Sequence, residues 1–421
     1  MTSRRLALAA LIVVISAGIA APAAAEELPR SGNAVFDRTV DLVNEHFYST
    51  DALPQFNQAA ALAVAQMPDL KDAPPGVVGD AVSFVLDSLS ASHTGRFVPD
   101  QVDYYELSDV FRFALRDNMR RLFPPRGRVT YAGIGIASAS IDGKSFAIHV
   151  YDGGPAARAG LVPGDEIVSV DGAPFAEIGS FRGKAGKTAH LMVRRAAGAA
   201  PIAIDVPVAE IRPGELFVEA IANSARSFDL GDSRIGYIRL WAYTSGHEVT
   251  DILYDELGEG RLKDVDGLVL DLRSKWGGAP GDAAETFVGA AADMVAVDRD
   301  GTRNVVTFRW HKPVVAIIDD GTRSGMEVLA YSLKKNGVPL VGSPTAGDVL
   351  AGTAYLLPDD SLLEVAVNDV FVDGERLEAN PVPPDVAVPF DIRYAGGRDP
   401  QFDAAVALMT ERLSQGGGGV N

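Results

Sequence analysis

Apolar residues recur with a helical period in the first part of the chain. Two groups are spaced three or four residues apart, as on one face of a helix: Phe36, Val40, Val43 and Phe47, and then Val82, Val85, Leu86 and Leu89. The stretch Asp72–Gly76 between the two groups consists of turn formers and predicts a loop. We therefore expect residues 31 to about 125 to be mainly helical and assign residues 26–127 to an N-terminal helical region.

From Tyr131 onward the pattern changes to short strands separated by turns. Asp142-Gly143 is a strong hairpin signal. Strands are expected at Phe146–Tyr151, Glu166–Val170, His190–Arg194 and Ile204–Ile211, with a short helix within Gly154–Leu161. This pattern predicts a compact β module over residues 128–212.

After Pro213 strands alternate with glycine-rich turns and helices. The expected strands are Arg234–Trp241, Gly267–Leu272, Pro313–Ile318 and Val338–Val341, and helices are expected from about Asp282 and over Met326–Leu333. Such alternation is typical of an α/β core, here residues 213–415, followed by a flexible tail over residues 416–421. The fold class is therefore multidomain α/β.

Composition excludes several classes of protein. The chain has 421 residues, of which 47% are hydrophobic and 22% charged, as in globular proteins, and this length predicts two or three domains. A formal net charge of −18 disfavours nucleic acid or an anionic membrane as the main partner. The chain has no cysteine, which excludes thiolate metal sites and cysteine nucleophiles. Nothing in the sequence indicates a metal or an organic cofactor.

The first residues have the pattern of a signal peptide. Arg4 and Arg5 precede the apolar run Leu6–Ala20, which is short for a transmembrane helix, and Ala23-x-Ala25 fits a signal-peptidase site. An uncleaved anchor is the alternative. We predict that residues 1–25 are removed and that the protein is exported, periplasmic or secreted, without a membrane anchor after cleavage.

Ser324 is the best candidate for a nucleophile. It stands where the predicted strand Pro313–Ile318 gives way to the predicted helix Met326–Leu333. A hydroxyl there lies at a helix N-terminus, where free backbone amides and the helix dipole favour developing negative charge. Because a serine at this position is more commonly an ordinary N-cap, both interpretations stay open on local sequence.

Two further features favour the catalytic interpretation. Gly277 and Gly278 follow a predicted strand, and glycines there let a substrate carbonyl approach backbone amides, as an oxyanion hole requires, although a plain turn is the alternative. With an ordinary pKa, His93 would be mostly neutral near pH 7 and able to accept a proton. Histidines at helix ends more often cap the helix or face solvent, and spacing alone does not bring His93 to Ser324.

Five motifs, in this order, resemble those of the C-terminal processing peptidases and their tricorn-core relatives. They are Gly133-Ile-Gly-Ile136, Gly160-Leu-Val-Pro-Gly-Asp-Glu-Ile-Val168, Leu270-Asp-Leu-Arg-x-x-x-Gly-Gly278, Gly321-Thr-Arg-Ser-Gly-Met-Glu327 and Gly342-Ser-Pro-Thr-Ala-Gly347. The resemblance covers nearly the whole mature chain. It implies that the β module is a PDZ-like domain and that the core has the crotonase/Clp-like β-β-α architecture. The peptide-carboxylate loop of the PDZ-like domain would be formed by Gly133, Ile134, Gly135 and Ile136.

The resemblance also implies roles for individual residues. Ser324 would be the nucleophile and His93 its base, with Ser92 and Glu378 orienting the imidazole. Glu375 competes with Glu378 for the last place, because Asn380-Pro381 departs from the usual pattern. The oxyanion hole would be formed by the amides of Gly325 and of Gly277 or Gly278.

Departures from the pattern favour the tricorn-like branch of the family, which uses a histidine preceded by a serine, over the tail-specific branch. The tail-specific branch has a catalytic lysine where this chain has Asp348. Lys334 and Lys335, about three helical turns after Ser324, are expected to face solvent. Lys275, in the predicted oxyanion loop, would bind a substrate carboxylate or be solvated, and we favour solvation.

These observations predict an exported serine endopeptidase that cleaves peptides or protein tails by a Ser–His–Ser–Glu mechanism. Peptide or protein substrates are the expected partners, and no oligomeric state is indicated. The main alternative is a catalytically silent peptide-binding protein on the same scaffold, supported by the absent lysine, by Gly325-Met326 and by Asn380-Pro381. A crotonase-like acyl-CoA enzyme is a third interpretation, but it explains neither the PDZ-like module nor the export signal.

Overall fold

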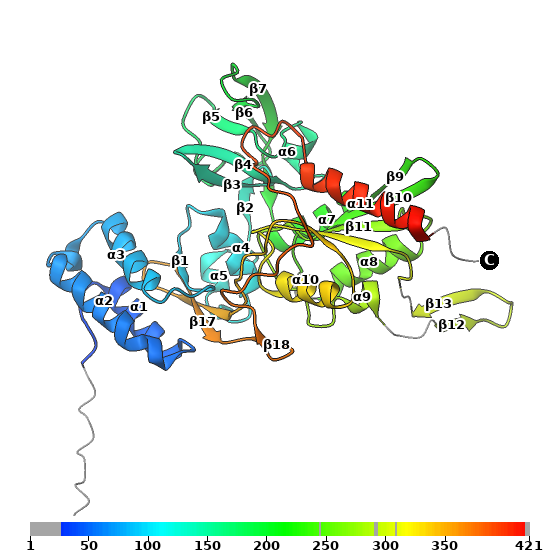
Figure 1. Ribbon diagram of the computed structural model, residues 1–421. Helices are drawn as coiled ribbons and strands as arrows, with labels where there is room; N and C mark the ends of the chain where they lie inside the picture. The colour runs from blue at the N-terminus through cyan, green and yellow to red at the C-terminus, as the bar shows by residue number, and fades with distance from the viewer. Residues whose placement is uncertain (1–26, 244–245, 290–293, 308–309, 417–421) are drawn as a thin grey trace, which may run out of the picture.

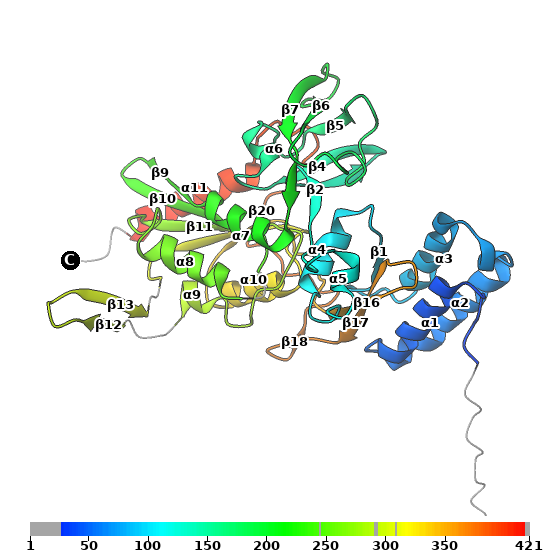
Figure 2. The same cartoon turned by 180° about the vertical axis from the view of Figure 1, so that it is seen from behind.

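The computed structural model describes residues 27–243, 246–289, 294–307 and 310–416. Three parts follow one another: a helical bundle at one end, a β module and an α/β core (Figure 1). From behind, the β module rises above the junction of the other two parts (Figure 2). The predicted signal peptide (residues 1–25) and residues 417–421 lie outside the described part of the chain. Within that part, no helix combines the length and apolar character needed to cross a bilayer.

The N-terminal region is mainly helical, as the apolar spacing predicted. Phe36, Phe56 and Val82 are fully buried where three helices meet. These helices are α1 (Ala34–His46), α2 (Leu53–Gln66) and α3 (Pro75–Asp87), with short 3-10 turns at Thr50–Ala52 and Leu70–Asp72 and then α4 (Val102–Val110) and α5 (Met119–Leu122). The loop predicted over Asp72–Gly76 is wrong in its second half, because Pro75 starts α3 with a fixed φ suited to a first turn.

A strand that the apolar pattern did not predict joins this region to the core. β1 (Gly95–Phe97) pairs antiparallel with β17 (Leu362–Asn368), which also pairs with β16 (Ala351–Leu356). Leu363 and Val365 of β17 are buried in the same hydrophobic cluster as α1, α2 and α3. The three-residue strand is too short to show a period of two, so only the partner strand reveals it.

The β module contains a five-stranded antiparallel sheet within the described residues. Its order follows the chain: β3 (Ile136–Ile141), β4 (Lys144–Val150), β5 (Glu166–Val170), β6 (Thr188–Arg194) and β7 (Ile202–Pro207), with α6 (Pro155–Arg158) beside it. The hairpin predicted at Asp142-Gly143 joins β3 to β4, and both residues have positive φ. The hairpin prediction is confirmed.

One strand predicted for this module is divided in two. The expected strand Ile204–Ile211 forms β7 and then β8 (Ala209–Ile211), which pairs with β2 (Tyr131–Gly133). At Val208 the chain changes partner: its amide donates to Lys187, and its carbonyl accepts from Gly186. Both halves are extended, so the sequence period cannot show that the partner changes between them.

The core is built on a second sheet. Among the described residues its strands lie in the order β20 (Val386–Ala387), β15 (Leu340–Gly342), β14 (Val314–Ile318), β11 (Gly267–Asp271), β10 (Ser233–Arg239) and β9 (Arg226–Leu230). All neighbours are parallel except β9 and β10. The predicted α/β architecture is therefore confirmed. Two small hairpins lie outside this sheet among the described residues: β12 (Met294–Val297) with β13 (Arg303–Thr307), and β18 (Phe371–Val372) with β19 (Glu375–Arg376).

Helices cover both faces of this sheet. One face packs Leu268, Leu270 and Ala316 against α7 (Pro213–Ser224), α8 (Glu248–Gly258) and α10 (Gly325–Lys335). The alternate residues Val269 and Val315 face α11 (Pro400–Gly416), which lies across the opposite face (Figure 1). Burial on both faces explains why these strands are continuous apolar runs.

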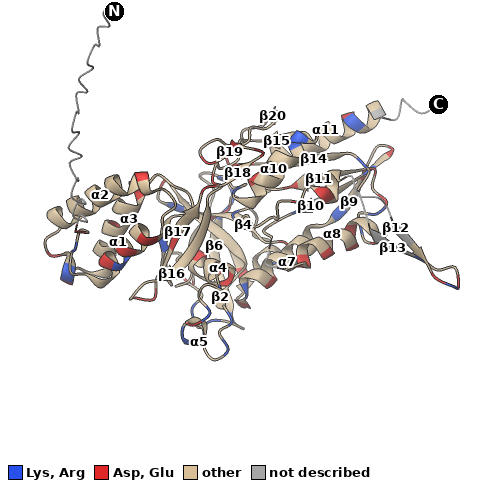
Figure 3. Cartoon of the chain, turned by 90° about the horizontal axis from the view of Figure 1, so that it is seen from below, with Lys and Arg blue, Asp and Glu red and all other residues tan. Residues whose placement is uncertain are grey.

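The helix predicted from about Asp282 is only one turn long. It is α9 (Glu285–Val288), and Gly289 ends it by donating its amide to Glu285. A side chain at this position would place its first carbon 2.3 Å from the Glu285 carbonyl oxygen, so the close approach requires glycine. In the view from below, acidic residues lie along the N-terminal helices, α7 and α8 (Figure 3).

A buried ion network fixes α11 to the end of β11. Arg273 donates to both carboxylate oxygens of Asp271 at 3.0 and 2.7 Å and to those of Asp399, just before α11, at 2.9 and 2.6 Å. Burial opposes ionisation of Asp271, but the Arg273 guanidinium outweighs it and holds the pKa of that carboxyl below its usual range. Tyr237 donates a further hydrogen bond to Asp271.

We predict that Arg273→Met destabilises the fold by about 3–5 kcal/mol, because the buried Asp271 carboxylate loses the cation that contacts both of its oxygens and keeps only Arg239, 4.0 Å away. Urea unfolding measures this loss. The difference in the free energy of unfolding between variant and wild type should become smaller at acid pH, because Asp271 without Arg273 binds a proton in the folded state. The double variant Arg273→Met/Asp271→Asn is the control and should recover part of the stability; equal loss in both would contradict the explanation.

Candidate active site

Ser324 is the residue immediately before α10, where β14 leads through a tight loop into the helix. Its backbone has φ 55° and ψ −132°, a conformation that non-glycine residues rarely adopt. Its amide donates to the carbonyl of Asp348 at 2.8 Å, and its side chain makes no capping bond to the helix. The ordinary N-cap interpretation is therefore wrong, and the hydroxyl is left for other contacts.

The structure brings His93 to Ser324 across 231 residues of sequence. The distance from His93 Nε2 to Ser324 Oγ is 3.2 Å, and the distance from His93 Nδ1 to Ser92 Oγ is 3.0 Å. His93 also has a positive φ of 51°, so both members of the pair are held in an unusual backbone conformation. The predicted juxtaposition of these two residues is present.

Glu378, rather than Glu375, completes the chain of contacts. Its carboxylate accepts from the Ser92 hydroxyl at 2.8 Å and from the Ser92 amide at 3.0 Å. Two more amides donate to it, those of Val349 at 2.8 Å and Leu350 at 3.2 Å. Glu378 is buried, whereas Glu375 lies exposed on β19.

These contacts define a consistent set of proton positions. If Nε2 of His93 accepts from Ser324, its Nδ1–H donates to Ser92 Oγ, and the Ser92 hydroxyl proton then points to Glu378. Burial is the main cause that lowers the pKa of His93, to about 4, and the nearby Arg323 lowers it further while Glu378 raises it. The imidazole is therefore neutral near pH 7 and able to accept a proton.

The two predicted glycine loops meet at Ser324. A side chain at Gly277 would place its first carbon 2.5 Å from Ser324 Cβ, and one at Gly325 would lie 2.6 Å from the amide nitrogen of Ala279. Gly278 has φ 88°. Within the described residues, the amides of Gly277, Gly278 and Gly325 donate to no acceptor. They are therefore available to an incoming oxyanion, a geometry that only glycine permits at such close approach.

A buried acid that sequence reasoning did not single out supports this loop arrangement. Glu327, on the first turn of α10, accepts from the Thr345 hydroxyl at 2.5 Å and from the amides of Gly347 and Asp348 at 2.8 and 2.6 Å. It thereby holds the segment whose Asp348 carbonyl binds the Ser324 amide. The signal was in the sequence, since an acid three residues after the serine is part of the quoted motif.

The lysines near the site have other partners. Asp348, at the position of the absent lysine, forms an ion pair with Arg323 at 2.9 Å. Lys334 pairs with Asp385 at 2.9 Å and Lys335 with Asp373 at 2.5 Å. Lys335 is exposed, as expected, but Lys334 is partly buried.

The expectation that Lys275 is solvated is wrong. Its ammonium pairs with Asp103 and lies 3.8 Å from Glu106, both on α4, and its side chain is only 22% exposed. The next residue, Trp276, donates its indole N–H to Glu106 at 2.7 Å. These contacts fix the oxyanion loop to the N-terminal region. The acids on α4 carried no motif that would have identified them.

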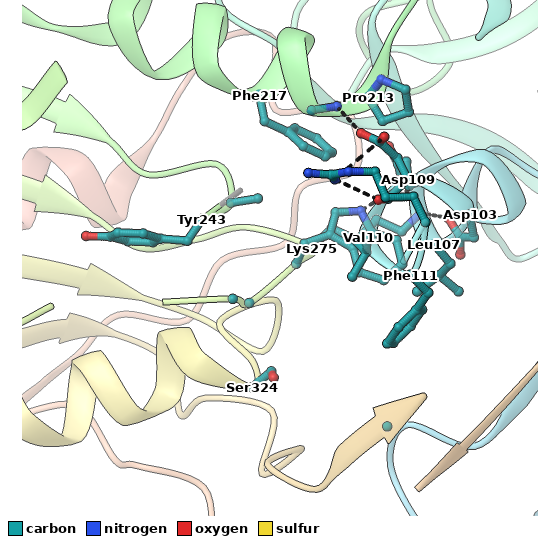
Figure 4. Close-up of a pocket in the computed structure, with 18 of the residues that line it drawn as sticks. Asp103, Leu107, Asp109, Val110, Phe111, Pro213, Phe217, Tyr243, Lys275 and Ser324 are labelled. Atoms are coloured by element: carbon teal, nitrogen blue, oxygen red, sulfur yellow. Dashed lines mark hydrogen bonds and ion pairs between the residues drawn. The ribbon is translucent and has the colours of Figure 1, made fainter. Parts of the chain in front are cut away.

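Ser324 and His93 open into a cavity of about 1170 Å³. Its wall combines Leu107 and Val110 of α4 and the following Phe111 with Phe217 and Tyr243 from the core. In the close-up, Ser324 stands at the start of α10 on one side, with the α4 residues on the other (Figure 4). The cavity is large and apolar enough for several residues of a peptide.

The predicted carboxylate loop lies in the β module. Ile134 and Ile136 are buried in the core of that module, and the carbonyl of Ile134 accepts from Ala156. Gly133 pairs with Ala209, and Gly135 has φ 75°. No group of histidine, aspartate and glutamate side chains suited to a metal ion occurs among the described residues.

Comparison with known proteins places this geometry in a family. Residues 234–388, which contain Ser324, the glycine loop and Glu378, match the model of peptidase family S41, and residues 149–184 match that of the PDZ domain. The part of the chain that carries the candidate site therefore resembles peptidase family S41. The predicted resemblance and the PDZ domain are thus confirmed.

This chain is similar to known processing proteases. It is 26% identical over 298 residues to the carboxy-terminal processing protease CtpA of Bacillus subtilis (strain 168), covering 66% of this chain and 61% of that protein. Its fold resembles that of the photosystem II D1 C-terminal processing protease (TM-score 0.50, 21% identity, 88% of this chain and 98% of the other). It also resembles that of the tricorn protease (TM-score 0.51, 18% identity), with 90% of this chain and 36% of the other covered.

We predict that Ser324 keeps its reactivity at pH values far below the ordinary pKa of histidine. Since the neutral imidazole is the active base and its pKa is about 4, the rate of labelling by a fluorophosphonate should fall only as pH drops through about 4. Arg323→Met removes a charge that lowers this pKa, so its acid limb should lie at higher pH. Circular dichroism at each pH separates titration from unfolding. A wild-type midpoint at 6.5 or above would contradict the prediction.

Proposed function

We propose that this chain is an exported serine endopeptidase of the C-terminal processing or tricorn-like type, which cleaves peptides or protein tails. The observation that carries the proposal is the 3.2 Å contact between His93 Nε2 and Ser324 Oγ. A neutral imidazole within hydrogen-bond reach of a serine hydroxyl that makes no cap is the arrangement that nucleophilic acyl transfer requires. Export rests on the pattern of residues 1–25 alone.

In the first half of the reaction Ser324 Oγ attacks the scissile carbonyl carbon, and its proton passes to His93 Nε2. The imidazolium that forms is stabilised through Ser92 by the carboxylate of Glu378, which is held in place by four hydrogen bonds. The tetrahedral oxyanion accepts from the amides of Gly325 and of Gly277 or Gly278. His93 then gives its proton to the leaving amine, and an acyl-enzyme remains.

In the second half a water molecule attacks the acyl-enzyme while His93 accepts its proton. Collapse of the second tetrahedral intermediate returns the proton to Ser324 and releases the new carboxylate. Ser324 and His93 are the catalytic residues in this scheme. Ser92 and Glu378 are positioning residues, because they act on the substrate only through the imidazole.

Peptide recognition is proposed for the PDZ domain. Strand β3 is at one edge of its sheet, and an extended peptide adds to such an edge by main-chain hydrogen bonding. Gly133, Ile134, Gly135 and Ile136 lead into that strand and would receive the terminal carboxylate. We propose domain limits of 26–127, 128–212 and 213–415 for the mature chain.

The principal test is labelling and hydrolysis by the purified protein. We predict that a fluorophosphonate labels the wild type and that Ser324→Ala abolishes labelling. His93→Ala should lower kcat/KM for a peptide by about 10³-fold or more, because nucleophile and base act as a unit. A folded wild type that neither reacts with the probe nor cleaves peptides would favour the silent peptide-binding alternative, for which Asp348 is the supporting departure.

A matched pair of variants tests the role of the acid. Glu378→Gln keeps the shape but removes the charge that stabilises the imidazolium, so kcat should fall by about 10²-fold or more, with a smaller change in KM. Glu375→Gln makes the same change at an exposed position on the neighbouring strand, and its kcat should stay within about twofold of the wild type. Equal effects of the two substitutions would overturn the assignment.

A further inference from the structure

A second carboxyl lies beside the Ser324–His93 pair and takes no part in the scheme above. Glu364, on β17, lines the same cavity and is only 7% exposed. Within the described part of the chain it has no hydrogen-bond or ion-pair partner. Glu378 and Glu327, the other buried acids nearby, each accept several hydrogen bonds. Hydrogen bonds or ion pairs to the described residues therefore do not explain why this carboxyl is buried.

Residues with small side chains or none let this carboxyl approach His93 closely. Directly opposite Glu364 are Gly95 on β1 and Ala354 on β16, and Gly352 follows on the same face. A side chain at Gly352 would place its first carbon 2.8 Å from Glu364 Oε1 and 3.0 Å from His93 Cβ. The carboxyl is thus next to the histidine, in a space walled by residues with small side chains or none.

No nearby cation fully compensates the charge of the Glu364 carboxylate within the described part of the protein. Burial raises the pKa of Glu364 to about 7, and Arg323 lowers it only in part. Arg323 is itself held by Asp348 at 2.9 Å. The other buried acid of the wall, Glu106, already has the Trp276 indole and the Lys275 ammonium near it. A desolvated carboxylate is costly alone and binds strongly to a cation that enters the same site.

We propose that Glu364 is a specificity determinant of the cleft and that it receives the ammonium or guanidinium group of a lysine or arginine flanking the scissile bond. This inference rests on the proposed peptidase function. The expected substrates are therefore peptides or protein tails with a basic residue next to the scissile bond. Substrates with a neutral residue there leave the buried carboxylate unpaired, and such a mismatch is strongly discriminated against.

Paired substrates isolate this interaction. Fluorogenic peptides carry lysine or its neutral analogue norleucine, and arginine or citrulline, at each position flanking the scissile bond. At about pH 8, where a carboxyl with a pKa of about 7 is ionised, the wild type should prefer each cation by about 10-fold or more in kcat/KM at one of these positions. Concentrations are set by fluorophosphonate titration of Ser324.

Glu364→Gln, which keeps the shape and removes the charge, should reduce that preference ratio by about 10-fold. Glu364→Leu is the second variant, and because an apolar group tolerates burial it covers the case in which the glutamine variant does not fold. The matched control is Glu219→Gln, which removes one charge from an exposed position of the same cavity wall. Its ratio should change by less than about twofold, because solvent screens exposed charges.

The outcomes separate this inference from the proposed function. Without fluorophosphonate labelling or peptide cleavage by the wild type, the peptidase function itself fails. If Ser324-dependent cleavage occurs with equal rates for charged and neutral analogues, the assignment of Glu364 is overturned while the peptidase function stands. The same holds if Glu364→Gln, Glu364→Leu and Glu219→Gln all leave the preference unchanged.

Discussion

The pairing of β1 with β17 is the contact on which the candidate site depends. Three residues of β1 lie antiparallel to Leu362–Glu364, with Gly95 opposite Glu364. His93 is two residues before that pair, so the register of one short strand sets where the imidazole lies relative to Ser324. The apolar contacts of α1, α2 and α3 with Leu363 and Val365 hold this register. A shift of one residue would move every side chain of β1 to the other face.

Buried carboxylates organise the loops around the reacting pair. Glu327 binds the amides of Gly347 and Asp348, and Glu378 binds those of Val349 and Leu350. Four consecutive backbone amides are thus held by two acids, one from α10 and one from the segment after β19. This explains how Ser324 and His93 can keep positive φ values: the surrounding hydrogen bonds outweigh the local strain of about 1–3 kcal/mol per residue. Asp348, which stands where the tail-specific branch has a lysine, also holds this loop. Its backbone carbonyl accepts from the Ser324 amide, and its side chain pairs with Arg323.

Desolvation acts in opposite directions on the titratable groups of the cavity. It lowers the pKa of His93 to about 4 and so keeps the base neutral, and it raises the pKa of Glu364 to about 7. Helix α4 forms part of the cavity wall and is tied to the glycine loop through Lys275 and Trp276. The N-terminal region therefore supplies His93, the candidate base, and part of the cavity wall.

Local sequence determined the parts of this protein whose signals are local. Periodicity identified α1, α3 and the buried strands β11 and β14, and turn chemistry identified the hairpin at Asp142-Gly143, because each depends on residues close in the chain. The order of the motifs and the family resemblance predicted one active site that contains Ser324, His93, Ser92 and the glycine loops. Tertiary structure decided what depends on distant partners. It distinguished Glu378 from Glu375, divided the strand at Val208, paired Lys275 with α4 and brought Glu364 close to His93. Each of these is set by backbone pairing or charge contact between segments far apart in sequence, and no period or spacing along the chain encodes which distant group will be the neighbour.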